Sequence, residues 1–176
     1  MLAIVAPGQG AQTPGFLNPW VESARVRELL EWWSAVAQVD LIRLGTVAEA
    51  DEIKDTANAQ PLIVAAGLVG ALSLFPHPSD AFNKVGITAG HSVGELTAAA
   101  GARAITAESA MVLVRERGKE MAKASAITPT GMSAILGGER AAVLSAISTL
   151  GLTAANDNGA GQIVAAGDLS ALAKLA

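Results

Sequence analysis

A serine between two glycines is the clearest candidate for chemistry in this sequence. Ser92 is the centre of Gly90-His91-Ser92-Val93-Gly94, which matches the G-x-S-x-G pattern of a nucleophile elbow. The two glycines relieve crowding, so that a strained turn can lift the hydroxyl above a sheet. The pattern predicts that Ser92 is a covalent nucleophile. The plainer alternative is that Ser92 only caps the following helix.

Arg117 lies inside the apolar stripe of a predicted helix. Steps of about 100° per residue place it on one face with four apolar side chains. These are Ala110, Leu113, Val114 and Met121. An inward guanidinium keeps its proton and requires an anion or several acceptors. One hypothesis is that Arg117 binds the carboxylate of a dicarboxylic acyl group. The structural alternative is that Arg117 pairs with an internal acid such as Glu95, or that its side chain reaches solvent at the edge of the stripe.

Two short apolar runs are predicted to be the strands that position these groups. Leu2 to Ala6 is predicted as a buried strand that ends in a glycine loop, and Val85 to Ala89 as a strand that leads directly into the serine turn. The first predicted helix covers residues 18–39, with Asn18 as its N-cap and Pro19 in its first position. The second extends from about Pro61 to Leu74 and is ended by Pro76 and Pro78. The third extends from Thr106 to about Ala124.

The residues after Ala124 follow a different pattern. The predicted elements are a strand at 132–136, a helix at 139–150, strands at 152–155 and 162–166, and a helix at 169–176. This is a β-α-β-β-α series, which needs one more strand to complete a ferredoxin-like arrangement. We therefore expect an α/β protein, with a hydrolase-like parallel-sheet domain over residues 1–124 and an incomplete ferredoxin-like α+β subdomain over residues 125–176.

Composition excludes several classes of partner and chemistry. The 176 residues are 51% hydrophobic and carry a net charge of −4, which gives no electrostatic reason to expect nucleic acid or a membrane as a partner. There is no cysteine, so a thiolate nucleophile, a disulfide and a cysteine-bound zinc are excluded. The apolar start ends at Pro7-Gly8, too early for a signal peptide, and a cytoplasmic location is the default expectation.

Five segments together resemble the malonyl-CoA:acyl carrier protein transacylase family of fatty acid and polyketide synthesis. They are Pro7-Gly8-Gln9-Gly10-Ala11-Gln12, Gly90 to Glu95, Arg117-Gly118 with Met121, Asn156-Asp157-Asn158, and Gly161 to Gly167. They occur in the family's order and cover the whole chain. The resemblance implies malonyl-CoA and acyl carrier protein as partners, a coenzyme A thioester as substrate, and no metal or redox cofactor.

The resemblance also implies roles for individual residues. Ser92 carries the acyl ester and Arg117 binds the malonyl carboxylate, while Gln9 and the backbone amide of Val93 form the oxyanion hole. His91 diverges from Ser92 on the turn and is expected to line the acyl pocket. Three residues are more weakly assigned to the neighbourhood of the substrate channel: Gln12, Asn156 and Gln162. Each could equally be a loop residue whose side chain satisfies backbone groups.

The general base that the family uses, a histidine far downstream of the serine, has no counterpart in this sequence. His77 is predicted in a surface turn, and neither it nor His91 is assigned the base. Our hypothesis is a truncated chain that lacks the C-terminal remainder of the family's fold; a second chain that supplies the base is less favoured. The alternative functions are a serine hydrolase or thioesterase, and a noncatalytic fragment that binds an acyl-CoA or a carrier protein.

Overall fold

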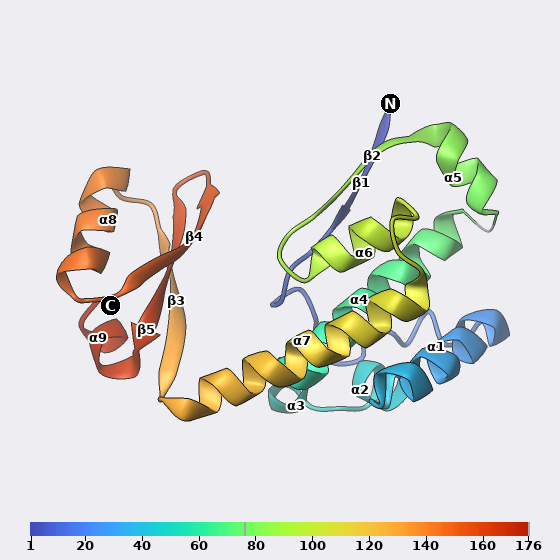
Figure 1. Cartoon of the computed structure of the whole chain (residues 1–176), viewed down its shortest axis with the longest axis horizontal. Coiled ribbons are helices and arrows are strands. Elements are labelled where there is room, and N and C mark those ends of the chain that lie inside the picture. Colours follow the sequence, from blue (N-terminus) through green and yellow to red (C-terminus); the bar gives the residue numbers. More distant parts are fainter. Residues whose placement is uncertain (76, 176) are drawn as a thin grey trace. The chain divides into compact units, whose positions relative to one another are not determined.

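Residues 1–75 and 77–175 are described in a computed structural model, in which the chain divides into two units, Met1–Ala122 and Lys123–Ala176 (Figure 1). Each unit has its own sheet and its own cluster of buried apolar side chains. The break predicted at Pro76 lies outside the described residues. The chain has an α/β fold, as expected.

The sheet of the first unit consists of two parallel strands, β1 (Leu2–Ala6) and β2 (Val85–Gly90). Both predicted strands are confirmed. The prediction that the first is buried was wrong, because only Ala6 is buried while Val5 is 76% exposed. Among the described residues each strand pairs only with the other, and helix α6 (Gly94–Gly101) packs against both.

The first long helix, α1 (Ala24–Ala37), begins five residues later than predicted, with Ser23 rather than Asn18 as its N-cap. The reason is tertiary. The amide of Leu17 donates to the carbonyl of Gly45 at 2.9 Å, and its side chain is only 1% exposed. This docking holds residues 14–23 in successive turns, and the amide of Asn18 is used in one of them, as a donor to Gly15.

Helix α4 (Thr56–Leu74) begins five residues before Pro61, earlier than predicted. The carboxylate of Asp55 caps it by accepting from the amide of Ala57 at 2.8 Å. Three short helices were not predicted: α2 (Leu41–Thr46), α3 (Ala50–Lys54) and α5 (Pro78–Lys84). Pro78, predicted as a breaker, is the first residue of α5, a position in which its missing N–H has no consequence.

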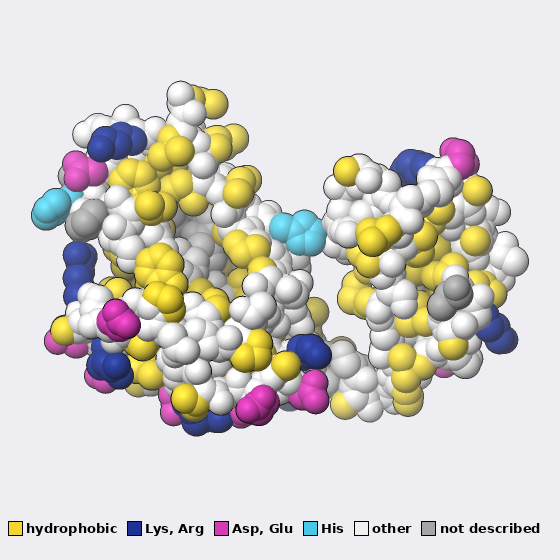
Figure 2. Space-filling model, turned by 180° about the vertical axis from the view of Figure 1, so that it is seen from behind, with side chains coloured by type: hydrophobic (Ala, Val, Ile, Leu, Met, Phe, Trp, Pro, Cys, Tyr) yellow, Lys and Arg dark blue, Asp and Glu magenta, His cyan; other side chains and the backbone are white. Residues whose placement is uncertain are grey.

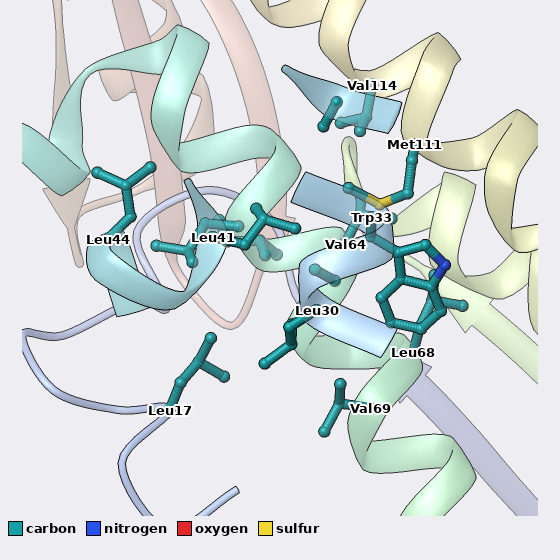
Figure 3. Packing of buried hydrophobic residues seen from close by; sticks show 14 of the residues in the cluster. Leu17, Leu30, Trp33, Leu41, Leu44, Val64, Leu68, Val69, Met111 and Val114 are labelled. Carbon is teal, nitrogen blue, oxygen red and sulfur yellow. The ribbon is translucent and has the colours of Figure 1, made fainter. Parts of the chain in front are cut away.

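Helix α4 forms the centre of the larger core. The apolar cluster around it includes Trp33 and Leu30 from α1 and Met111 from α7 (Ala107–Ile127) (Figure 3). By length and composition α4 is also the one helix of the described residues that is able to cross a membrane, but half of its most apolar window is buried inside the unit. A buried core helix can have the same length and composition, and α4 packs in this unit as a core helix does.

Helix α7 (Ala107–Ile127) begins as predicted after Thr106, whose hydroxyl accepts from the amide of Ser109 at 3.1 Å. Its buried stripe differs from the prediction. The buried residues are Ala110, Met111, Val114 and Gly118, whereas Leu113 and Met121 are 49% and 41% exposed. The buried stripe is thus rotated from the predicted one and includes Gly118, which lies against the start of α4.

The charged face of α7 is only partly solvated. Arg115 donates to the carbonyl of Val36 at 3.0 Å, and Lys119 donates to Oε1 of Gln38 at 3.5 Å. Both acceptors lie at the C-terminal end of α1, where cations stabilise unpaired carbonyl groups. These two cations are therefore engaged inside the unit.

The second unit has the predicted β-α-β-β-α order. Its elements are β3 (Thr130–Leu136), α8 (Arg140–Thr149), β4 (Thr153–Gly159), β5 (Gln162–Asp168) and α9 (Leu169–Leu175). The sheet is antiparallel in the order β3-β5-β4, and both helices contribute to its core. Glu139, predicted as the first helical residue, is the N-cap of α8 and accepts from the amide of Ala142 at 2.9 Å.

Candidate active site

The turn after β2 holds Ser92 in the left-handed region, with φ of 54°, and leaves the residue exposed. Glycines make this turn possible. A Cβ on Gly90 would lie 2.2 Å from the carbonyl of Gly94, and a Cβ on Gly94 would lie 2.4 Å from the carbonyl oxygen of Ala6. No side chain fits at either position, so both glycines of the motif are required by backbone contact. Such strain at an exposed serine is typical of a nucleophile elbow.

Helix α6 starts directly after the serine. Val93 is its N-cap, and the amides of Gly94 and Glu95 donate to the carbonyls of His91 and Ser92, each at 3.0 Å. The Ser92 hydroxyl does not cap this helix, so the plainer alternative has no support. Within the described residues the amide of Val93 has no recorded acceptor. It is a free donor at a helix N-terminus, where negative charge is stabilised.

The side chain of Arg117 contacts the hydroxyl of Ser92. Its Nη2 donates to the serine Oγ at 3.2 Å, and its Nη1 donates to Oε1 of Gln60 at 2.6 Å. Among the described residues Arg117 forms no salt bridge, so the predicted structural pair with Glu95 is not formed. The guanidinium is half-buried, oriented, and without a carboxylate partner.

The lack of a side chain at Gly118 lets α7 lie close to the start of α4, next to Arg117. A Cβ on Gly118 would lie 3.1 Å from the carbonyl oxygen of Thr56 and 3.3 Å from Cα of Ala57, both at the start of α4. A larger residue would push the two helices apart. Because Gly118 follows Arg117 directly, the closest approach of the helices places the guanidinium beside Gln60.

Sequence reasoning missed Gln60. Its side chain is 1% exposed, and its Nε2 donates to the sulfur of Met121 at 3.1 Å. The available signal was a single amide within an apolar run, from Ala59 to Ala65, because a polar residue in such a run needs partners.

The loop after β1 is tied to the start of α4. Gln9 donates from Nε2 to Oγ1 of Thr56 at 3.3 Å and to the carbonyl of Lys54 at 3.4 Å. Its side chain is thus occupied, and its backbone amide has no recorded acceptor within the described residues. A Cβ on Gly8 would lie 2.5 Å from Nδ1 of His91, so the loop packs directly against the elbow.

Gln12 uses both ends of its amide to hold the same loop. Its Oε1 accepts from the amide of Gly10 at 2.9 Å, and its Nε2 donates to the carbonyl of Ile53 at 2.9 Å. It satisfies backbone groups, as one of the two interpretations of this residue expected.

The remaining predicted residues belong to other elements of the chain. Asn156 is half-buried in β4, and Gln162 at the start of β5 accepts from Nδ2 of Asn158 at 2.7 Å, so both belong to the hairpin of the second unit. His77 is exposed at the start of α5. In the part of the chain that the structure describes, no three side chains of His, Asp or Glu form a group able to hold a metal.

A cavity of roughly 420 Å³ lies in the first unit, and its lining includes neither Ser92 nor Arg117. Apolar groups of β1, β2, α4 and α6 form most of its wall, and Figure 2 shows hydrophobic side chains around a hollow on this unit. Two buried polar atoms at the wall, Nε1 of Trp33 and Oγ1 of Thr97, have no partner within the described residues.

Comparison with known proteins identifies relatives over the whole of this chain. No protein-family model matches the chain. The malonyl CoA-acyl carrier protein transacylase of Mycobacterium tuberculosis strain H37Rv is 53% identical over 176 residues, which is 100% of this chain and 58% of that protein. The chain is a homologue of the malonyl-CoA:acyl carrier protein transacylases. It spans little more than half of their length.

Solved structures show the same relationship. The crystal structure of the transacylase from M. tuberculosis has a TM-score of 0.91 and 52% identity, and the match covers 98% of this chain and 57% of that chain. A second match is a malonyl-transacylase in complex with an acyl carrier protein of a type II polyketide synthase, with a TM-score of 0.84, 28% identity, and coverage of 98% and 57%. The α/β fold with its parallel sheet is common to these transacylases.

Proposed function

We propose that this chain is the part of a cytoplasmic transacylase that accepts a malonyl group from coenzyme A onto Ser92, for transfer to the phosphopantetheine thiol of an acyl carrier protein. The observation that carries the proposal is the hydrogen bond from Arg117 to the exposed Ser92 hydroxyl, at 3.2 Å. This bond brings the nucleophilic oxygen and the proposed carboxylate-binding guanidinium so close that one small acyl group can contact both.

In the first half-reaction, Oγ of Ser92 attacks the thioester carbonyl while a base removes its proton. The negative oxygen that forms lies between the backbone amides of Gln9 and Val93, whose hydrogens have no other acceptor among the described residues. Carbon–sulfur cleavage then releases the coenzyme A thiol and leaves an acyl-serine ester. The proposal assigns the base to no residue of the chain.

In the second half-reaction, the phosphopantetheine thiol attacks this ester. The carbon–oxygen bond to Ser92 breaks, the thioester of the carrier protein forms, and the proton of the thiol returns to the serine. The reaction consumes no oxidant and needs no metal. The relative solved with a bound carrier protein supports this choice of acceptor.

The spacing of the two groups favours malonyl over longer diacids. Each carbon–carbon bond adds about 1.5 Å between the carbonyl and the distal carboxylate. Because Nη2 of Arg117 is already 3.2 Å from the serine oxygen, a carboxylate two bonds from the reacting carbonyl is within reach of the guanidinium. Succinyl and glutaryl groups would have to fold back or displace the arginine.

Under this proposal, each of the two units corresponds to one part of the transacylase fold. The first, expected over residues 1–124, is the elbow-bearing part of a hydrolase-like domain. The second, expected over 125–176, is a ferredoxin-like subdomain with its last strand outside the chain. Gln12 then supports the loop that carries Gln9, and His91 lines the acyl pocket. Asn156 and Gln162 are proposed substrate-channel residues.

Intact-mass analysis after mixing with malonyl-CoA tests the proposal. We expect the complete gene product to gain one malonyl group, and the Ser92→Ala variant to gain none. Addition of carrier protein should then move the group to the carrier. Release as free malonate would instead identify a hydrolase, and the absence of any adduct on the parent protein would leave only a binding function.

A further inference from the structure

Gln60 is a buried polar residue whose function the proposed mechanism does not explain. Its side chain is 1% exposed and lies in the apolar part of α4. Both ends of its amide are bonded, since Oε1 accepts from Arg117 at 2.6 Å and Nε2 donates to Met121 at 3.1 Å. A buried amide is costly without such partners, so this side chain has one favoured orientation.

The acceptor that Gln60 offers to Arg117 is neutral. An amide oxygen fixes a guanidinium through one hydrogen bond and leaves its positive charge uncompensated. A carboxylate at the same place would form an ion pair and compete with an anionic substrate. Within the described residues no Asp or Glu pairs with Arg117, although Arg43, Arg115 and Arg140 all do pair with carboxylates.

From this difference we infer that Gln60 is a positioning residue that sets the acyl selectivity of the site. It directs one edge of the guanidinium and leaves the remaining N–H groups and the full charge for a carboxylate next to Ser92. Arg117 has five N–H donors, of which only two are used in this structure. The inference rests on the proposed malonyl transfer and adds to it the origin of the preference for a charged acyl group.

The decisive variant is Gln60→Glu, which keeps the size and shape of the side chain and adds one negative charge. The new ion pair should neutralise Arg117 toward substrate. We expect KM for malonyl-CoA to rise and the ratio of malonyl to acetyl loading on Ser92 to fall about tenfold or more, while acetyl loading changes little. Gln60→Met, which removes the acceptor but leaves the charge, should lower the ratio by less.

A matched control is Gln38→Glu. Gln38 also accepts a hydrogen bond from a cation of α7, Lys119, but its side chain is exposed. This variant introduces the same charge on the same unit and should leave the ratio unchanged. Urea unfolding of all three variants reports whether any loss comes from a weakened fold.

Two outcomes are separable. If the parent protein forms no malonyl ester, the proposed function fails and the selectivity of the variants has no meaning. If the parent protein is loaded but Gln60→Glu lowers malonyl and acetyl loading by equal factors, or changes neither, then Gln60 has only a structural role and the inference is overturned.

Discussion

Oγ of Ser92 and Nη2 of Arg117 lie 3.2 Å apart, although the serine belongs to a turn after β2 and the arginine to the middle of α7. The elbow fixes one partner by backbone contacts and the helix fixes the other by packing at Gly118. Under the proposed function, this single contact would combine selection of the acyl group with attack on it.

Replacement of Arg117 by alanine should discriminate between acyl groups. We expect kcat/KM for malonyl-CoA to fall about ten- to a hundredfold more than kcat/KM for acetyl-CoA, because only malonyl leaves a carboxylate unpaired. Steady-state transfer to carrier protein measures both values. Arg115→Ala is the control, since Arg115 bonds to α1 instead; equal losses for the two substrates in Arg117→Ala would contradict the carboxylate-binding role.

The positive φ of Ser92 predicts an unusual order of stabilities. Ser92→Gly should be more stable than Ser92→Ala by about 1–2 kcal/mol, because only glycine adopts this conformation without a Cβ penalty. Urea unfolding measures the difference. At Ser145, an exposed residue inside α8, the order should be reversed by about 0.5–1 kcal/mol. The same order at both sites would argue against strain at the elbow.

Gly94 and Gly70 should respond in opposite ways to alanine. A methyl group on Gly94 would overlap the carbonyl oxygen of Ala6 at 2.4 Å, and we expect a loss of about 1–3 kcal/mol together with loss of acylation at Ser92. Gly70, inside α4, has nothing within 4 Å of a new methyl group, so Gly70→Ala should stabilise by about 0.5–1 kcal/mol. An unaffected Gly94→Ala protein would refute the contact-limited elbow.

Three carboxylates should make the second unit sensitive to acid. Backbone amides at the start of α8 lower the pKa of Glu139, Arg140 lowers the pKa of Asp157, and Ser170 lowers the pKa of Asp168. The unfolded chain binds their protons more readily, so stability is full above the ordinary pKa values and is lost as the pH falls below about 4.

Carboxyl chemical shifts followed by NMR test this directly, since all three midpoints should lie below those of an unfolded peptide. Asp168→Asn should lower stability at pH 7 and have little effect at pH 2. A midpoint at or above the ordinary value would show that the corresponding hydrogen bonds do not favour the charged form.

Features that depend on neighbouring residues could be predicted from the sequence. The elbow at Ser92 requires glycines two positions away, and the strands, helices and order of the second unit follow from short apolar periods. The inward arginine was recognised because Arg117 interrupts an apolar stripe, although the observed stripe is rotated and shares only Ala110 and Val114 with the predicted one.

Features that depend on contacts between distant segments could not be predicted. The start of α1 is delayed because Leu17 docks against Gly45, which local propensity does not reveal. Gln60 becomes a partner of Arg117 only because Gly118 lets α7 approach the start of α4. A single amide in an apolar run shows that a partner exists, but its identity requires the tertiary structure.

The exposed position of Ser92 and the lack of cysteine in the chain give the elbow a practical use. Within these 176 residues, Ser92→Cys would introduce a single thiol at the reacting position, without a competing site for maleimide or iodoacetamide reagents. A fluorophore or spin label attached there would lie beside the guanidinium of Arg117. Its signal would report the arrival of an anionic acyl thioester without any need for turnover.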